Sequence, residues 1–377
     1  MPSRLRLLRS KVLVNELGRF FKEEERSLGT HVALRWNGRV RFTVPRERAA
    51  QQACWKTLCP GRLELPLRAM VRLPRLFGAT SCVEREDLAA IRELLGSEAG
   101  ISCCRTGTIS AWSKDTILFL NKETKPLYIV KAGTGKVANA LLEHEAEWLQ
   151  RLRSQVALAD HIPEFVAHCS GANISFIAQH ALVGNLDFRL GEAQFEFLQK
   201  LQDYSIQSKP YGESNLFLAF NSRLKDLRGL LTEAWTTRIQ KAMRKIEKSL
   251  ARTPVLLVAA HNDFAPWNMR IQHNSVSVFD WEFAEDEQFP VFDPLHFTLM
   301  PMVLKRASTA SLIQTMNRTL ILCQHWFGEE RCKHAEIQSL AYFVNLCTLY
   351  LWLVQGTYGT HPALDGYADV IDYLCLP

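Results

Sequence analysis

One stretch, residues 261–282, constrains this chain more than any other, because polar side chains follow two apolar segments there. The apolar run 255–260 predicts a short buried strand. The segment after it contains a proline and has no helical period, so it predicts a loop. Residues 275–279 alternate and predict a second strand. The pattern therefore predicts that two carboxylates and an amide are presented at the ends of two neighbouring strands: those of Asp263, Asp280 and Asn268.

Phosphoryl transfer from a magnesium nucleotide requires this set of side chains. One carboxylate must accept or orient the proton of the attacking hydroxyl, and carboxylate and amide oxygens must hold the metal ions that bridge the phosphates. In protein kinases the base Asp precedes the metal-binding Asn by five positions, and the metal-binding Asp comes later in the chain. Asp263, Asn268 and Asp280 have the same order and the same five-residue step.

This order and its context resemble the aminoglycoside phosphotransferase and choline kinase family, the small-molecule branch of the protein-kinase-like fold. In that family the loop usually reads His-Gly-Asp-x-x-x-x-Asn, and the later motif reads Asp-Phe/Trp-Glu. This chain has Asn262 in place of the usual Gly, and Asn tolerates unusual φ angles better than most residues. By this resemblance Asp263 is the catalytic base, and Asn268 and Asp280 are the ligands of Mg²⁺.

The resemblance also implies supporting roles around the loop. His261 is expected to buttress the loop from behind, and Glu282 to assist at the metal. Asp293 lies where the family usually has an Asp that braces the loop from the start of a helix, although an N-cap followed by Pro294 explains it equally. Turn capping is the structural alternative for any of these polar residues taken alone. Their joint occurrence favours the kinase-like interpretation.

A strand that ends in a lysine supports the same interpretation. Lys131 has the position from which a kinase-like lysine reaches the α- and β-phosphates, and an exposed strand-end lysine is the structural alternative. The helix predicted at 141–149 should supply a glutamate that pairs with this lysine. By resemblance to the family's Arg-Glu-Ala-x-x-Leu pattern this glutamate is Glu145, with Glu143 and Glu147 as alternatives.

Two further segments are expected to contact ATP. The turn at 105–110 and the strand at 116–120 predict a hairpin that covers the phosphates with backbone N–H groups, with a single glycine in its turn. Strands at 162–166 and 174–179 lead to a hinge near Gln179, where adenine could hydrogen-bond to the backbone.

Helical periodicity dominates after residue 184. Helices are predicted at 195–202, at 224–250 and from 298 to the carboxyl terminus, whereas 211–220 is loop-like and expected to line an acceptor site. The longest apolar run, 341–354, is too short for a membrane span and predicts a buried helix. The ten cysteines include no C-x-x-C pair and follow no signal peptide, which indicates a reducing compartment, and we expect a soluble, cytoplasmic protein.

The first part of the chain is strongly basic. Residues 1–75 hold 17 Lys or Arg against 6 Asp or Glu, although the net charge of the whole chain is only +6. Residues 1–26 predict an amphipathic helix, either docked on the protein or acting as a membrane-surface or transit segment, and docking is favoured. Residues 32–44 predict a hairpin around Asn37-Gly38. The absence of a recognition motif argues against a nucleic-acid partner.

These observations predict an α+β, protein-kinase-like two-lobe fold. The expected parts are a basic N-terminal α+β extension at 1–99, a β-rich N-lobe at 100–183 and a helical C-lobe at 184–377. The expected function is ATP-dependent phosphorylation of a hydroxyl on a small molecule, such as a sugar, an amino alcohol, an aminoglycoside-like compound or a glycan precursor. The alternatives are a nucleotide-binding pseudokinase and an accessory protein that meets a membrane or anionic polymer through its basic N-terminal segment.

Overall fold

The computed structural model describes residues 21–24, 30–36, 39–59, 80–107, 112–170, 175–250, 254–353, 361 and 363–376. The chain forms two compact units: Met1–Arg153 with Pro163–Gly184, and Ser154–Ile162 with Asn185–Pro377. The first unit is a sheet with helices, and the second is mainly helical, which confirms the α+β, kinase-like fold class.

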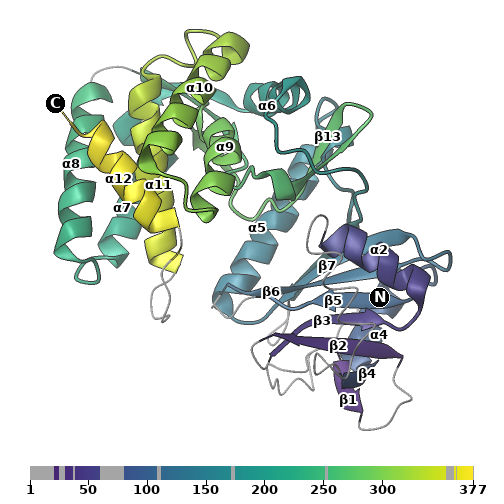
Figure 1. The fold of residues 1–377 in the computed structure, drawn as a ribbon. Coiled ribbons are helices and arrows are strands. Elements are labelled where there is room, and N and C mark those ends of the chain that lie inside the picture. Colours follow the sequence, from purple (N-terminus) through teal and green to yellow (C-terminus); the bar gives the residue numbers. More distant parts are fainter. Residues whose placement is uncertain are drawn as a thin grey trace. The chain divides into compact units, whose positions relative to one another are not determined.

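The first unit contains a nine-stranded antiparallel sheet within its described residues, in the order β1-β4-β2-β3-β5-β6-β7-β9-β8 (Figure 1). The strands are β1 (Phe21–Glu24), β2 (His31–Trp36), β3 (Arg39–Pro45), β4 (Thr80–Glu84), β5 (Ser102–Arg105), β6 (Lys114–Leu120), β7 (Pro126–Gly133), β8 (Phe165–Cys169) and β9 (Ser175–His180). The helices are α2 (Arg48–Leu58), α4 (Glu86–Leu95) and α5 (Lys136–Arg153).

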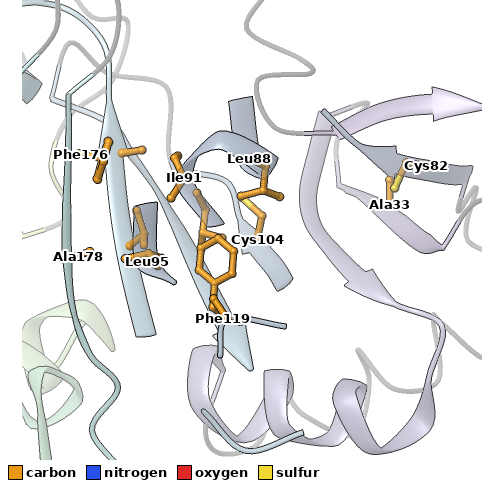
Figure 2. Close-up of a cluster of buried hydrophobic side chains, with 13 residues drawn as sticks. Ala33, Cys82, Leu88, Ile91, Leu95, Cys104, Phe119, Phe176 and Ala178 are labelled. Carbon is orange, nitrogen blue, oxygen red and sulfur yellow. The ribbon is translucent and has the colours of Figure 1, made fainter. Parts of the chain in front are cut away.

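Period-two alternation divides the side chains of this sheet between two cores. On one face Ile117 and Phe119 of β6 pack with Leu88, Ile91 and other residues of α4, as Figure 2 shows for part of the cluster. On the opposite face the next residues of β6, including Leu118, pack under α2. Both faces are therefore covered by helices that precede β5 in the chain.

The N-terminal strands continue the sheet of the lobe that follows them. Strand β3 pairs with β5, with Phe42 opposite Arg105. The hairpin predicted at 32–44 is confirmed by the pairing of β2 with β3, while its Asn37-Gly38 turn lies outside the described residues. The basic segment therefore contributes strands and core to the first unit.

Predictions for the first 80 residues meet the structure only in part. The helix predicted at 1–26 lies outside the described residues except at Phe21–Glu24, where it is wrong. That segment forms β1, because its backbone pairs with β4. Most of the proline-rich stretch after α2, residues 60–79, also lies outside the described part of the chain.

The second unit contains a three-stranded sheet in the order β10-β11-β14 and a two-stranded sheet of β12 and β13 among its described residues. The strands are β10 (Ile206–Pro210), β11 (Pro254–Ala260), β12 (Met269–Gln272), β13 (Ser275–Val278) and β14 (Glu285–Gln288). The α-helices are α6 (Glu192–Tyr204), α7 (Asn215–Asp226), α8 (Glu233–Leu250), α9 (Phe292–Leu304), α10 (Thr309–Phe327), α11 (Ala335–Leu353) and α12 (Ala363–Leu374), and the short 3-10 segments are η1 (Ala159–His161), η2 (Tyr211–Glu213) and η3 (Pro266–Asn268).

Three details of the predicted second unit are wrong. The strands β11 and β13 are not neighbours, because β13 pairs with β12 in a separate sheet. The segment predicted as a loop at 211–220 becomes helical from Asn215, where the Ser214 hydroxyl caps α7 by accepting from the backbone N–H of Phe217 at 3.1 Å. The helix predicted at 224–250 is divided, since α7 ends at Asp226 and α8 begins at Glu233.

Most residues of α11 are buried, as the length and composition of this helix predict. No helix in the described ranges is long and apolar enough to cross a membrane.

The shared core of the first unit gives a stability prediction. Trp55 of α2 is 1% exposed and packs edge-on against Phe42 of β3, with ring centroids 5.6 Å apart. Trp55→Ala should lower the free energy of unfolding by about 3–5 kcal/mol through lost burial and a residual cavity. The neighbouring exposed residue supplies a control, since Lys56→Ala should change the free energy of unfolding by less than about 0.5 kcal/mol. Equal denaturation midpoints for the two variants would show that α2 is not part of the core.

Candidate active site

The loop after β11 begins with a residue in the left-handed conformation. Asn262 has φ 62°, and its side-chain Nδ2 donates to the backbone carbonyl of Phe283 at 2.8 Å. Few residues other than Gly and Asn adopt such a φ without cost. Asn262 therefore fits a backbone turn that would also suit Gly, and adds a hydrogen bond that Gly cannot make.

A buried carboxylate holds the loop backbone in place. Asp293 of α9 accepts from the backbone N–H of His261 at 2.8 Å and from that of Asn262 at 2.9 Å. Burial raises the pKa of Asp293 to about 6, although these two donors lower it. Asp293 is the second residue of α9, whose N-cap is Val291, so its carboxylate braces the loop and does not cap its own helix.

His261 is fully enclosed behind the loop. Its Nδ1 accepts from the backbone N–H of Asp263 at 3.2 Å, and its Nε2 donates to the carbonyl of Phe279 at 3.0 Å. One nitrogen accepts and the other donates, so the imidazole is neutral. Burial lowers the pKa of His261 from 6.5 to about 4, while the charges of Asp263 and Asp280 oppose this shift. The predicted buttress role of His261 agrees with these contacts.

Asp263 and Asn268 are in direct contact. The Nδ2 of Asn268 lies 2.7 Å from Oδ2 of Asp263 and 3.0 Å from the carbonyl oxygen of Asp263. Because both neighbours are acceptors, the contacting atom must be the amide nitrogen, and Oδ1 of Asn268 is left to accept or to coordinate. The five-residue step therefore brings the proposed base and a proposed metal ligand side by side.

The segment from Asp280 to Glu282 follows β13. Asp280 also has a left-handed backbone, with φ 74°, and Trp281 is buried edge-on against His261, with ring centroids 4.6 Å apart. Glu282 is buried as well. No group of three or more His, Cys, Asp or Glu in the described part of the chain is arranged to hold a metal ion. Joint coordination of Mg²⁺ by the Asp280 carboxylate and the amide oxygen of Asn268, both hard oxygen ligands suited to this ion, stays a prediction.

Within the first unit, the predicted lysine pairs with a glutamate of α5. Nζ of Lys131 lies 2.5 Å from Oε1 of Glu145, and both side chains are buried. The two alternatives, Glu143 and Glu147, are exposed on the other side of the helix. A buried, paired lysine is inconsistent with the strand-end alternative, because an unpaired Lys would stay in solvent.

Gln179 lies on the same face of the sheet as Lys131. In the register of β7 with β9, Ile129 is opposite Gln179 and Lys131 is opposite Ile177, and directly opposed residues share a face. Gln179 is 3% exposed, and its Oε1 has no hydrogen-bond partner among the described residues. The backbone N–H of Ala181 already donates to the carbonyl of Leu127 at 2.9 Å. A nucleotide contact at this end of β9 stays a prediction.

The hairpin predicted from the turn at 105–110 is present as β5 paired with β6, and its contact with phosphates stays a prediction. Gly107 lies at its described edge, where an added Cβ would come within 2.3 Å of the carbonyl oxygen of Lys114. Arg41 of β3 donates to the carbonyl of Gly107 at 3.1 Å, so the N-terminal extension contacts this hairpin. The turn residues 108–111 lie outside the described chain.

One residue that contacts the loop was not predicted from the sequence. His296 of α9 is 1% exposed, and its Nε2 lies 3.0 Å from Oδ1 of Asp263. The signal was present, because His296 follows Asp293 by three positions and residues three apart share a face of a helix.

The backbone of Asn262 can be tested by substitution. Asn262→Ala should lower the free energy of unfolding by about 2 kcal/mol or more, because a left-handed Ala costs roughly 1–2 kcal/mol and a hydrogen bond is lost as well. Asn262→Gly should cost about 1 kcal/mol, since only the hydrogen bond and some chain entropy are lost. Chemical denaturation measures both values, and equal losses would contradict a conformational requirement at this position.

The buried His261 predicts a pH effect on stability. Its folded pKa, about 4, is below the unfolded value of 6.5, so the unfolded chain binds more protons between these values. The contribution of His261 to the free energy of unfolding therefore falls as pH drops from 6.5 to 4, by at most about 3 kcal/mol. Asp293 has the opposite effect. Because its pKa is raised in the folded protein, its contribution to the free energy of unfolding falls as pH rises toward 6.

Comparing wild type with His261→Gln separates the effect of His261 from that of Asp293, because Asp293 is present in both proteins. The wild type should lose more stability than the variant between pH 7 and pH 4, as measured by urea denaturation. Parallel pH curves would contradict a neutral, buried His261.

Comparison with known proteins finds solved structures of similar fold and one matching protein family. The solved structures with a similar fold include a thermostable mutant of aminoglycoside phosphotransferase APH(4)-Ia in ternary complex with AMP-PNP and hygromycin B, at 14% identity and a TM-score of 0.51, covering 76% of this chain and 96% of that one. They also include the choline kinase LicA from Streptococcus pneumoniae, at 16% identity and a TM-score of 0.53, covering 77% of this chain and 99% of that one.

A choline/ethanolamine kinase family protein from Mesorhizobium loti matches at 16% identity with a TM-score of 0.50, covering 76% of this chain and 94% of that one. No curated protein sequence matches significantly. At these identities the structural matches show the fold. The model of the phosphotransferase enzyme family matches residues 108–293, which include the Lys131–Glu145 pair and the segment from His261 to Asp293. This chain therefore belongs to the phosphotransferase enzyme family.

Proposed function

We propose that this protein is an ATP-dependent kinase that phosphorylates a hydroxyl group of a small molecule. The observation that carries the proposal is the contact between Asp263 and Asn268, in which the amide nitrogen faces the carboxylate and leaves the amide oxygen for a cation. The Asp263 side chain is 26% exposed, so its carboxylate can be reached by an incoming hydroxyl. Membership of the phosphotransferase family supports the same reaction type.

Asp263 is the proposed general base. It accepts the proton of the acceptor hydroxyl as that oxygen forms a bond to the γ-phosphorus of ATP, while the bond between the γ-phosphorus and the bridging oxygen of ADP breaks. The reaction gives the phosphorylated acceptor and ADP. Because the transition state is loose, the main task of the carboxylate is to orient the hydroxyl rather than to create a strong nucleophile.

Lys131 is the proposed ligand of the α- and β-phosphates. Its 2.5 Å contact with Glu145 fixes the direction of a long, flexible side chain before the nucleotide binds. Asn268 and Asp280 are the proposed ligands of Mg²⁺, which when bound neutralises charge on the phosphate oxygens. Gln179 is proposed to lie near the adenine, on the same face of the sheet as Lys131.

The acceptor belongs to a class and not to one compound. Hygromycin B is a ligand of one protein of similar fold, and choline kinases share that fold as well. Sugars, amino alcohols, aminoglycoside-like compounds and glycan precursors all carry suitable hydroxyl groups. We propose this class, because acceptor pockets in such folds are built from segments that vary independently of the catalytic loop.

Nucleotide binding is the first test. Mg-ATP should raise the melting temperature of the wild type by several degrees, since a ligand at 100 times its Kd adds about 2.7 kcal/mol to the folded state. Asp280→Asn should abolish most of the magnesium-dependent rise. Asn is the better replacement than Ala here, because it tolerates the left-handed backbone of this position.

An exposed carboxylate in the same unit supplies the control. Asp226→Asn, at the end of α7, should keep the full rise with Mg-ATP. Absence of any rise in the wild type at millimolar Mg-ATP would refute the proposed function. Once binding is shown, ADP release in the presence of a panel of hydroxyl compounds identifies the acceptor. Asp263→Asn should then slow that release by about 10²–10⁴-fold, the usual contribution of a general base.

A further inference from the structure

Both carboxylate oxygens of Asp263 have a hydrogen-bond donor. Nδ2 of Asn268 lies 2.7 Å from Oδ2, and Nε2 of His296 lies 3.0 Å from Oδ1. Two donors on different oxygens fix the rotation of the carboxylate plane, which a single donor would leave free. Each oxygen keeps a further lone pair, because a carboxylate offers about four acceptor sites.

The imidazole of His296 approaches from the interior of the protein. Its side chain is 1% exposed, whereas that of Asp263 is 26% exposed. His296 therefore contacts the buried side of the carboxylate and leaves the exposed side to an incoming hydroxyl. One turn of α9 thus supplies two contacts, because Asp293 holds the loop backbone and His296 holds the side chain of the base.

The other nitrogen of His296 faces a tyrosine. The hydroxyl of Tyr342 on α11 lies 3.4 Å from Nδ1, a long hydrogen bond, and the two rings meet edge to face. Burial raises the pKa of Tyr342 well above its usual value, so the phenol stays protonated and can donate to Nδ1. Because an ionised carboxylate can only accept, the proton of a neutral His296 lies on Nε2, which faces Asp263.

The other titratable groups around this pair do not replace the donor. His261 gives its Nε2 proton to the carbonyl of Phe279. Burial lowers the pKa of His361, which precedes α12, to about 4, against the opposing effect of Asp263. Its ring stacks on that of Tyr350 of α11, whose phenol stays protonated because burial raises its pKa. Asp293 is occupied by the two loop N–H groups.

Building on the proposed function, we propose that His296 is a positioning residue for phosphoryl transfer. Its Nε2–H holds one oxygen of Asp263 while Asn268 holds the other, so the carboxylate meets the acceptor hydroxyl in one fixed orientation. Tyr342 supports this by holding the imidazole. A positioning effect of this kind changes turnover and leaves the binding of Mg-ATP intact, since the contact of His296 with Asp263 involves neither Lys131, nor Glu145, nor a proposed ligand of Mg²⁺.

Two replacements of His296 separate hydrogen bonding from packing. His296→Leu introduces an apolar side chain of similar bulk and removes the donor. His296→Gln places an amide nitrogen near the position of Nε2. In the full-length protein, ADP release is measured with Mg-ATP and the acceptor that the screen of hydroxyl compounds identifies. Water serves as the acceptor if no screened compound reacts. The kcat of His296→Leu should fall by about 10- to 100-fold, with the KM for ATP within about twofold of wild type.

His296→Gln should recover most of the lost turnover, because the donor to Oδ1 is restored. The control on the same helix is Thr298→Val, which removes the hydrogen bond to Thr319 and should leave kcat unchanged. Melting temperatures of all three variants are measured in parallel, with and without Mg-ATP.

Each other outcome is decisive. Full turnover in His296→Leu, or equal losses in His296→Leu and His296→Gln, would overturn the positioning role. A loss of kcat that follows a matching loss of melting temperature in both variants would also overturn it, as a purely structural effect. A wild type that Mg-ATP does not stabilise refutes the proposed function itself, which is a separate result because it is seen before any variant is made.

Discussion

The carboxylate of Asp293 accepts hydrogen bonds from two consecutive backbone N–H groups, those of His261 and Asn262. Burying a carboxylate opposes ionisation, and burial raises the pKa of Asp293 to about 6. The two bonds compensate for this cost and fix the chain where it leaves β11. The left-handed turn at Asn262 follows from that constraint, and the direction in which Asp263 points follows from the turn. The geometry of the proposed base thus depends on a residue thirty positions away in the chain.

The first unit has a comparable constraint in the ion pair of Lys131 with Glu145. Removing one partner from a buried pair is far more costly than losing a surface pair, because the other charge is left unpaired. The surrounding sheet is stiffened by N-terminal strands, which share its two cores and reach the hairpin at Gly107 through Arg41. We infer that the described part of the basic extension stabilises this unit.

Local sequence patterns predicted much of this arrangement. The strand at β11, the loop after it and the strand up to Lys131 all follow from apolar runs bounded by turn residues. Predictions failed where pairing between distant segments overrides local preference. Residues 21–24 form a strand because β4 lies beside them, and β13 pairs with β12 rather than with β11. Neither partner choice is visible in a periodic pattern.

The sequence by itself determined which functional groups the candidate site can use, because the types and order of Asp263, Asn268 and Asp280 are covalent facts of the chain. It also predicted Glu145 as the partner of Lys131 over its neighbours on the helix, through resemblance to a family pattern. Only the tertiary structure decided which side chain holds the second oxygen of Asp263. His296 reaches that oxygen because α9 packs beside the loop, and packing of helices is set by shapes and contacts that no local spacing encodes.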